Sequence, residues 1–219
     1  MKRRHVLDLR PTQFAIGMTE VEKKAKKLRR LGKKALRAYI RKHPVKVIRS
    51  PQEELYIIDK HHTLMASWLI GVKKVRVDVQ TDLSGRGMSR TAFWRFMEGR
   101  RCTHLYDQFG EGPRGTLYLP VDIRGLSDDP YRSLAWLAQK EGAFEESRVR
   151  YYEFEWAQLL RQHKLLSPDG RSQLRRAVPE AVRVCRSPAA RDLPGFRGVA
   201  SSGGASSPHP VRIEATRSR

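Results

Sequence analysis

An apolar run, a charged turn and a helix follow one another directly in the first third of the chain. Residues 55–58 read "LYII", and the next five residues, "DKHHT", contain one acid, one lysine and two adjacent histidines. Apolar residues then recur to Ile70, and Gly71 closes a helix that we expect to begin at about His62. "KKVRVDV" at 73–79 alternates apolar and charged residues and predicts a returning strand. A strand, a helix and a second strand this close together favour a mixed α/β unit.

The residues before this unit predict further strands and helices. "VLDL" at 6–9 is typical of a short strand, and "RPTQ" turns the chain out of it. Apolar residues at helical spacing predict a helix from Thr19, and a second helix follows Gly32 and ends before Pro44. "VKVIRS" and "ELYIID" predict two strands joined by the turn "SPQE". The first eighty residues are therefore expected to form one compact α/β unit.

The rest of the chain is mostly helical in pattern. "SRTAFWRFMEGRR", "SDDPYRSLAWLAQKEG" and "EESRVRYYEFEWAQLLRQH" each predict a helix, and residues 173–186 suggest one more. Asp128 and Asp129 precede Pro130, which favours a helix N-cap over a catalytic carboxylate pair. The residues after Gly198 have too little apolar surface to fold. The expected fold class is α/β, with an α/β domain at 1–82, a mostly helical domain at 83–198 and a disordered basic tail at 199–219.

Positive charge is concentrated at the N-terminal end. The chain carries a formal net charge of +21, and residues 1–80 alone hold 21 basic against 7 acidic residues. The basic residues within 23–42 lie on two predicted helices whose apolar stripes face the other way. This asymmetry favours a polyanionic partner, and phosphorylated small molecules, nucleotides and nucleic acid all remain open. The alternative is an ordinary solvated helix face.

Other features narrow the class of protein. Cys102 and Cys185 are the only cysteines, which argues against a disulfide scaffold and a structural zinc. The first residues have no apolar stretch of the kind a signal peptide needs. The longest apolar segment, "LMASWLIGV", is too short to span a bilayer. We expect a cytoplasmic protein without a membrane partner.

The turn between residues 59 and 63 suits phosphate. Free backbone N–H groups and the positive end of the helix dipole point into such a turn. Lys60 adds a positive charge, His61 and His62 add hydrogen-bond donors, and Thr63 adds a hydroxyl. Zinc is disfavoured because adjacent histidines do not aim at one ion. The alternative is that Asp59 caps the helix while both histidines face water.

At this point the sequence resembles a known superfamily. The order strand, "RPTQ" turn, two helices, two strands, "DKHH" turn, helix and strand resembles the N-terminal domain of the ParB/sulfiredoxin superfamily over residues 5–80. ParB proteins carry Gly-Glu-Arg-Arg at this turn, sulfiredoxins Gly-Cys-His-Arg, and free-serine kinases of the fold Asp-Gly-His-His, which "DKHH" resembles most. "DDPYRSLAWLAQKEGAF", "EFEWAQLLR" and "AARDLPGF" resemble a bacterial group labelled ParB-like proteins or ParB-like nucleases, as far as residue 198.

The resemblance implies a binding site for nucleotide phosphates. It places around them the turn residues and two residues from the exit of the first strand: Asp59, Lys60, His61, His62, Thr63, Thr12 and Gln13. Sulfiredoxin chemistry is excluded because Lys60 stands where it needs a cysteine. The arginine pair of ParB is replaced by histidines, which departs from its cytidine-nucleotide switch. The serine kinases use a carboxylate after the first strand, where this chain has Thr12 and Gln13, so kinase activity is supported only in part.

Two functional hypotheses follow. The first is a ParB-like protein that binds a nucleotide triphosphate or diphosphate with Mg²⁺, or another phosphorylated ligand, for phosphoryl transfer or hydrolysis. Lys60 would then hold phosphates, His61 or His62 would act as donor or general acid–base, and Asp59 would orient a histidine or bind the metal. The second is a sequence-independent DNA-binding protein or nuclease that uses the basic helices. The sequence leaves the substrate and the oligomeric state open.

Overall fold

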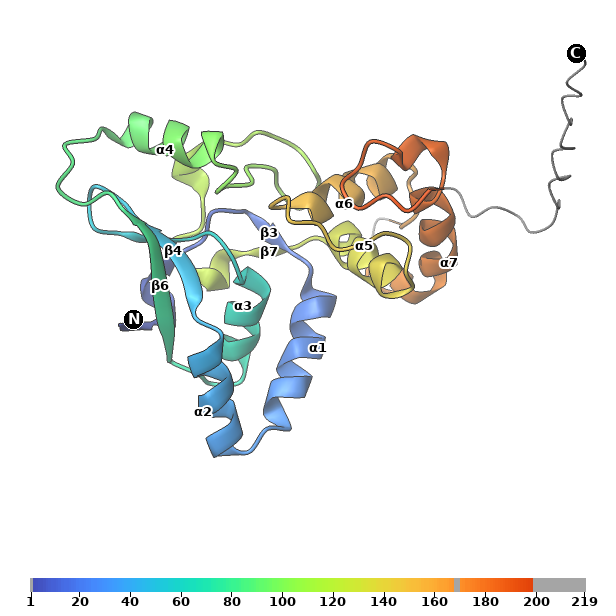
Figure 1. Cartoon of the computed structure of the whole chain (residues 1–219). Coiled ribbons are helices and arrows are strands. Elements are labelled where there is room, and N and C mark those ends of the chain that lie inside the picture. Colours follow the sequence, from blue (N-terminus) through green and yellow to red (C-terminus); the bar gives the residue numbers. More distant parts are fainter. Residues whose placement is uncertain (1, 168–169, 199–219) are drawn as a thin grey trace, which may run out of the picture.

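The computed structural model describes residues 2–167 and 170–198 of the 219-residue chain (Figure 1). The fold is mixed α/β, as predicted: a curled five-stranded sheet and, within the described residues, seven α-helices. The predicted disordered tail at 199–219 lies outside the described residues. None of the helices in the described ranges combines the length and the apolar character that crossing a bilayer requires.

The sheet has the strand order β1-β6-β4-β5-β2, which places β4 at its centre. β4 runs parallel to β6 and antiparallel to β5, β1 is antiparallel to β6, and β2 is parallel to β5. A separate two-stranded sheet pairs β3 with β7. The strands span Arg3–His5 (β1), Leu9–Arg10 (β2), Ala15–Ile16 (β3), Val45–Arg49 (β4), Leu55–Ile57 (β5), Lys74–Asp82 (β6) and Ser127–Asp128 (β7).

The predicted strand at 6–9 is wrong in its extent. Val6–Asp8 forms a 3₁₀ turn, and the strand β2 begins only at Leu9. The turn closes because the His5 ring accepts a hydrogen bond from the Leu7 N–H while the Asp8 carboxylate accepts one from the His5 N–H. This capping box uses side chains to satisfy the backbone groups that a strand would pair with a neighbour.

Helices cover both faces of the sheet. α1 (Met18–Arg29), α2 (Lys33–Lys42) and α3 (His61–Leu69) pack on the side of Val47 and Ile57, and α4 (Arg90–Gly99) packs on the side of Ile48 and Tyr56. Successive residues of a strand point to opposite faces, so β4 and β5 supply apolar residues to both layers. The predicted stripe of α1 is confirmed, because Val21, Ala25 and Leu28 are all buried.

The remaining helices form a third group, which Figure 1 shows gathered beyond α1 from the sheet. α5 (Pro130–Lys140), α6 (Tyr152–Gln162) and α7 (Leu174–Cys185) share an apolar core that includes Trp156 and Leu160. Asp129 caps α5 as predicted, since its carboxylate accepts hydrogen bonds from the N–H groups of Tyr131 and Arg132. Short 3₁₀ turns and extended segments connect α4 to α5.

The predicted boundary at residue 82 stays a prediction, and core packing crosses it. Ile123 and Leu126, from the segment before β7, are buried in the same cluster as Val21, Val47 and Leu64. The first core is thus completed by residues far along the chain, so residues 1–82 do not hold every side chain of their own core.

We predict that Ile123→Ala lowers the free energy of unfolding by about 2–5 kcal/mol, because it leaves a cavity at a fully buried position. Val121→Ala is the matched control: Val121 is 69% exposed, and its truncation is expected to change stability by at most about 0.5 kcal/mol. Urea unfolding followed by circular dichroism measures both. Equal effects of the two substitutions would show that Ile123 does not complete this core.

Candidate functional site

β5 leads into α3 through a turn at Asp59 and Lys60 whose backbone is unusual. Lys60 is the N-cap of α3, has φ +70° in the left-handed region, and makes no side-chain capping hydrogen bond. Only glycine adopts this region without strain, and glycine is the residue in the Asp-Gly-His-His turns that this one resembles. The first N–H groups of α3 are therefore not capped by a side chain, which favours an anion there.

Both histidines of the turn point inward. The His61 Nε2 accepts a hydrogen bond from the Thr12 N–H at 3.4 Å, and the His62 Nε2 accepts one from the Gly17 N–H at 3.3 Å. His61 is 4% exposed, so the alternative in which the histidines face water is wrong. Asp59 does not cap α3 either, because the N-cap is Lys60. The two rings instead fasten the segment after β2 to the start of α3.

Burial keeps both rings neutral. Desolvation lowers the pKa of His61 to about 3. Desolvation also lowers the pKa of His62 well below its ordinary value, although the nearby Glu20 carboxylate opposes this shift. A neutral ring whose Nε2 accepts a hydrogen bond carries its proton on Nδ1. The Thr12 N–H bond therefore assigns the Nδ1–H form to His61.

The predicted partners from the first turn lie beside this site. The buried Thr12 hydroxyl donates to the Ile57 carbonyl at 2.5 Å and lies 3.0 Å from the Tyr151 hydroxyl. The Gln13 amide donates to the Ala15 carbonyl at 2.6 Å. The structure thus brings the segment after β2 against the turn that follows β5. Tyr151, the N-cap of α6, adds a contact from much later in the chain.

A cluster of buried charge sits next to His62. Arg132 on α5 places its Nη2 3.3 Å from the Glu20 Oε2 and 2.9 Å from the Glu153 Oε1. Lys24 reaches the other Glu20 oxygen at 2.5 Å, and the His62 Nε2 is 3.4 Å from the Glu20 Oε2. Burial by itself would raise the pKa of Glu20, but the nearby positive charges of Arg132 and Lys24 act against burial, and the pKa is lowered to about 2. Glu20 is therefore ionised at neutral pH.

Arg132 is only partly satisfied by this cluster. It is 2% exposed, and its Nε and Nη1 have no hydrogen-bond partner among the described residues. Unpaired buried donors are rare in folded proteins and call for an explanation. Arg132 also lines a cavity that the turn residues border, and a small shift of its side chain would bring the unpaired donors to a ligand there.

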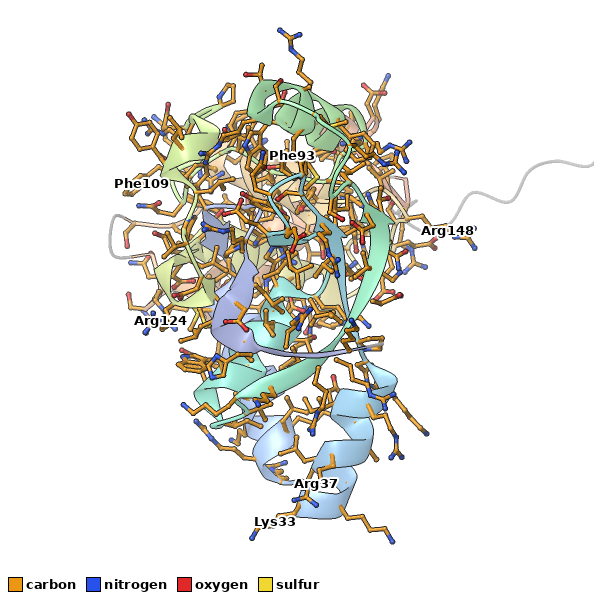
Figure 2. All side chains as sticks on the ribbon, turned by 90° about the vertical axis from the view of Figure 1, so that its left-hand side faces the viewer. Lys33, Arg37, Phe93, Phe109, Arg124 and Arg148 are labelled. Carbon is orange, nitrogen blue, oxygen red and sulfur yellow. The ribbon has the colours of Figure 1, made fainter. Side chains whose placement is uncertain are left out.

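This cavity has a volume of about 430 Å³ and a positive lining. We call it the turn cavity. Its charged residues comprise five basic side chains against two acidic ones: Lys46, Lys60, Arg132, Arg148 and Arg150, with Asp59 and Glu153. Figure 2 shows Arg148 projecting from the surface at the side of the molecule. The surplus of positive charge beside an uncapped helix start favours an anionic ligand.

The predicted site residues divide into three groups. Gln13, Asp59, Lys60, His61 and His62 line the turn cavity. Thr12 supports the turn from behind through its bond to the Ile57 carbonyl. The carbonyl of Thr63 accepts the Ser67 hydroxyl, and its side chain is not among the lining residues.

Sequence reasoning missed Arg132, although a signal for it exists. Arg132 precedes the buried Ala135 and Trp136 by three and four residues, so it lies on the apolar face of α5. A charge on such a face needs a buried partner. Glu20, which lies on the buried side of α1, is that partner.

The turn cavity offers little to a metal ion alone. Within the described residues no three His, Cys, Asp or Glu side chains are grouped as metal ligands. Asp59 is exposed, and Glu153 is engaged by Arg132. Mg²⁺ often binds through one or two carboxylates together with phosphate oxygens. These residues therefore fit an ion that arrives with a phosphorylated ligand, with Asp59 as the carboxylate for it.

Comparisons with known proteins agree with the fold. A family model described as "Putative ParB-like nuclease" matches residues 3–162. The crystal structure of protein Atu1540 from Agrobacterium tumefaciens is similar at 33% identity and a TM-score of 0.79, covering 90% of this chain and 98% of that one. C-terminally truncated ParB from Caulobacter crescentus, complexed to the centromeric parS site, matches 87% of this chain and 88% of its own at 14% identity. Its TM-score of 0.29 is too low to establish a shared fold. No curated protein matches.

We predict a pH dependence of stability from His61. Its pKa is about 3 when folded and about 6.5 when unfolded, so below pH 6.5 the unfolded chain binds a proton that the folded chain does not. Lowering the pH from 7 to 5 should therefore reduce the free energy of unfolding by about 2 kcal/mol through this residue alone.

The control is His61→Gln, whose amide oxygen still accepts the Thr12 N–H bond but does not titrate. Urea unfolding at both pH values should show a smaller loss of stability for the variant than for the parent. Equal losses would contradict the burial of a neutral His61.

Proposed function

The chain belongs to the ParB-like nuclease family, and on this premise we propose that the turn cavity binds a phosphorylated ligand for phosphoryl transfer or hydrolysis. The ligand class is a nucleotide or a phosphorylated small molecule. The observation that carries the proposal is Arg132, buried with two unpaired donors in a cavity that borders the uncapped start of α3.

The oxygens of a phosphate group are suitable acceptors for the unpaired donors of Arg132. The unpaired Nε–H and Nη1–H lie on different edges of the guanidinium, and each can donate one charge-assisted hydrogen bond to a phosphate oxygen. A buried donor without a partner costs roughly 1–3 kcal/mol, and more when it is charged. An anion at this point therefore removes a penalty as well as adding an attraction. The N–H groups of α3 supply further donors to the same ligand.

The other residues take supporting roles in this proposal. Lys60 now donates to the Pro44 carbonyl at 3.1 Å, and its flexible stem allows the ammonium group to turn to a phosphate. Arg148 and Arg150 lie at the exposed side of the turn cavity and attract the ligand. Asp59 is the exposed carboxylate that would position Mg²⁺ or accept a proton. Bound Mg²⁺ would neutralise phosphate charge.

The proposed role of the histidines differs from the one expected from sequence. A side chain with a pKa near 3 carries no extra proton at pH 7, so His61 does not act as an imidazolium acid. We assign His61 and His62 the role of holding the segment after β2 against the turn. Their removal is then expected to disturb the fold as well as ligand binding.

We predict that Lys60→Gly weakens polyphosphate binding by about tenfold or more, the loss expected for a charge-assisted hydrogen bond of roughly 1.5–3 kcal/mol. Glycine suits the left-handed backbone, so the variant removes the charge without adding strain. Thermal shift with tripolyphosphate, ADP and ATP, each with and without Mg²⁺, measures the effect by mass action.

Lys164→Gly is the matched control, because Lys164 is an exposed lysine with φ +52° that does not line the turn cavity. It should keep the ligand-induced shift of the parent. A parent without any shift, or a Lys60→Gly variant with an unchanged one, would count against the proposal.

A second candidate function is sequence-independent binding of nucleic acid. A groove of about 1060 Å³ runs between α1, α5 and the start of α7, and we call it the basic groove. Eight of its lining residues are basic and two are acidic. Lys26, Lys27 and Arg30 are exposed and form no ion pair among the described residues. The family description as nucleases supports this candidate. Figure 2 shows Lys33 and Arg37 in the first half of α2, at one end of the molecule.

We predict that duplex DNA binds at low salt and dissociates as salt rises, with a steep dependence on salt concentration. The double variant Lys26→Gln/Lys27→Gln should make the slope of log affinity against log salt shallower, as expected for the loss of about two phosphate contacts. Lys73→Gln/Lys74→Gln removes the same charge from exposed lysines outside the basic groove and should have little effect. Gel shifts over a salt series test this. Absence of binding at low salt would remove the candidate.

A further inference from the structure

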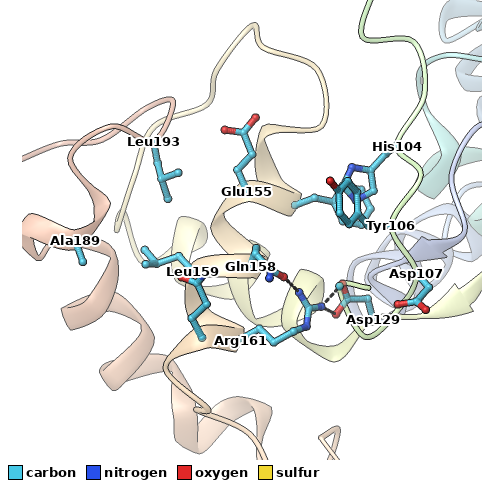
Figure 3. Close-up of a pocket in the computed structure, with 13 residues that line it drawn as sticks. His104, Tyr106, Asp107, Asp129, Glu155, Gln158, Leu159, Arg161, Ala189 and Leu193 are labelled. Carbon is cyan, nitrogen blue, oxygen red and sulfur yellow. Dashed lines mark hydrogen bonds and ion pairs between the residues drawn. The ribbon is translucent and has the colours of Figure 1, made fainter. Parts of the chain in front are cut away.

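A second cavity of about 530 Å³ shares Phe154 with the turn cavity (Figure 3). It opens between α6, the loop at 104–110 and the segment near residues 189–193. We call it the Phe154 cavity, because Phe154 is the one side chain that lines both this cavity and the turn cavity. Its lining has fewer basic residues than that of the turn cavity.

One wall of the Phe154 cavity is aromatic and the other is aliphatic. The His104 ring stacks on Phe154 at a centroid distance of 4.0 Å and an interplanar angle of 21°. Tyr106 lies 5.4 Å from the His104 ring and is 41% exposed, so part of its surface is free to contact a ligand. Figure 3 shows Leu159 and Leu193 across the cavity from His104 and Tyr106. Two apolar walls that face each other suit a flat ring.

The floor of the Phe154 cavity is polar and fixed. Arg161 donates to both oxygens of the buried Asp129 at 2.8 Å and to the Gln158 Oε1 at 2.7 Å. The loop approaches this floor closely at Gly110, where a Cβ would clash with the Gln158 Oε1. The Asp107 carboxylate holds the loop by accepting the Phe109 and Glu111 N–H groups. A ligand edge would therefore meet groups that are already in place.

The polar side chains of the Phe154 cavity offer both hydrogen-bond donors and acceptors to the edge of a ligand ring. The side-chain amide of Gln158 accepts a hydrogen bond through its Oε1. Its Nε2 donates to none of the described residues. Glu155 lies above Gln158 in Figure 3, and its carboxylate, whose Oε1 is paired with Arg101 at 2.5 Å, has its Oε2 left as an acceptor. The three carboxylates of the lining are each paired with an arginine, and the one lining arginine, Arg161, is held by Asp129, so the lining has no unpaired cation for a phosphate or a carboxylate ligand. Burial lowers the pKa of His104 to about 4, so its ring is a neutral stacking surface.

We propose that the Phe154 cavity binds a nucleobase. An uncharged heteroaromatic ring with donors and acceptors on its edge matches the two apolar walls, the free Gln158 amide and the Glu155 carboxylate. The volume lies within the range of small-molecule sites. The proposal goes beyond the phosphate site and does not depend on it, because a nucleoside without phosphate suffices as ligand.

The test uses nucleosides on the full chain. Adenosine, guanosine, cytidine and uridine are titrated by isothermal calorimetry, and at least one is expected to bind. Ala189→Phe fills the cavity from an exposed position, which spares the core, and should weaken binding by about tenfold or more, a change of roughly 1.4 kcal/mol. Ala189→Ser, which adds little volume, should bind as the parent does. Gln158→Leu should weaken nucleosides but not phenol, an aromatic ring without the ring nitrogens and amino groups of a base.

The outcomes separate this proposal from the phosphate site. Lys60→Gly should leave nucleoside binding unchanged. If no nucleoside binds, or if Ala189→Phe binds as Ala189→Ser does, the nucleobase proposal is wrong whatever tripolyphosphate does. If phenol binds as tightly as every nucleoside and Gln158→Leu changes neither, the cavity is merely apolar and the proposal also fails. Nucleoside binding without any polyphosphate shift would refute the phosphate site alone.

Discussion

The buried ion pair between Arg132 and Glu20 joins the two halves of this molecule. Glu20 belongs to α1 and Arg132 to α5, and the same cluster draws in His62 from α3 and Glu153 from α6. Removing one partner of a buried pair typically costs about 3–5 kcal/mol, because the remaining charge is left without compensation. Three helices, α1, α5 and α6, are thus tied by charge at the point where the turn cavity forms, and the neutral His62 ring of α3 lies against the same carboxylate. The position of the cavity follows from this cluster.

The Arg132 cluster differs from an ion pair that only stabilises the fold. A pair that served only stability would satisfy the donors of Arg132, yet its Nε and Nη1 stay unpaired within the described residues. The start of α3 also has unsatisfied backbone groups, because Lys60 has a left-handed backbone and its side chain does not cap the helix. Strain and unpaired groups of this kind collect at functional sites. Their coincidence at one cavity is the physical basis for a phosphate ligand.

The helices and strands could be predicted from local sequence patterns, whereas contacts between distant residues determine which side chains meet at the site. The apolar spacing of α1 and the alternation in β6 could be read from sequence, because each reflects one buried face. The strand expected at 6–9 failed since a local capping box around His5 replaced strand pairing. The turn was found by its composition, but its histidines bond to backbone groups 49 and 45 residues away. No spacing rule foresees such partners, and the same holds for Arg132.

The most direct test of the central claim observes Arg132 itself. Arginine side-chain ¹H–¹⁵N spectra of the full chain, with Arg132→Lys used to assign the signal, report on the Nε–H during titration with tripolyphosphate. The account predicts a saturable shift of the Arg132 Nε–H as it gains a hydrogen bond, with parallel changes in the backbone N–H signals of His61 and His62. An Arg132 signal that stays unmoved while tripolyphosphate binds elsewhere would contradict it.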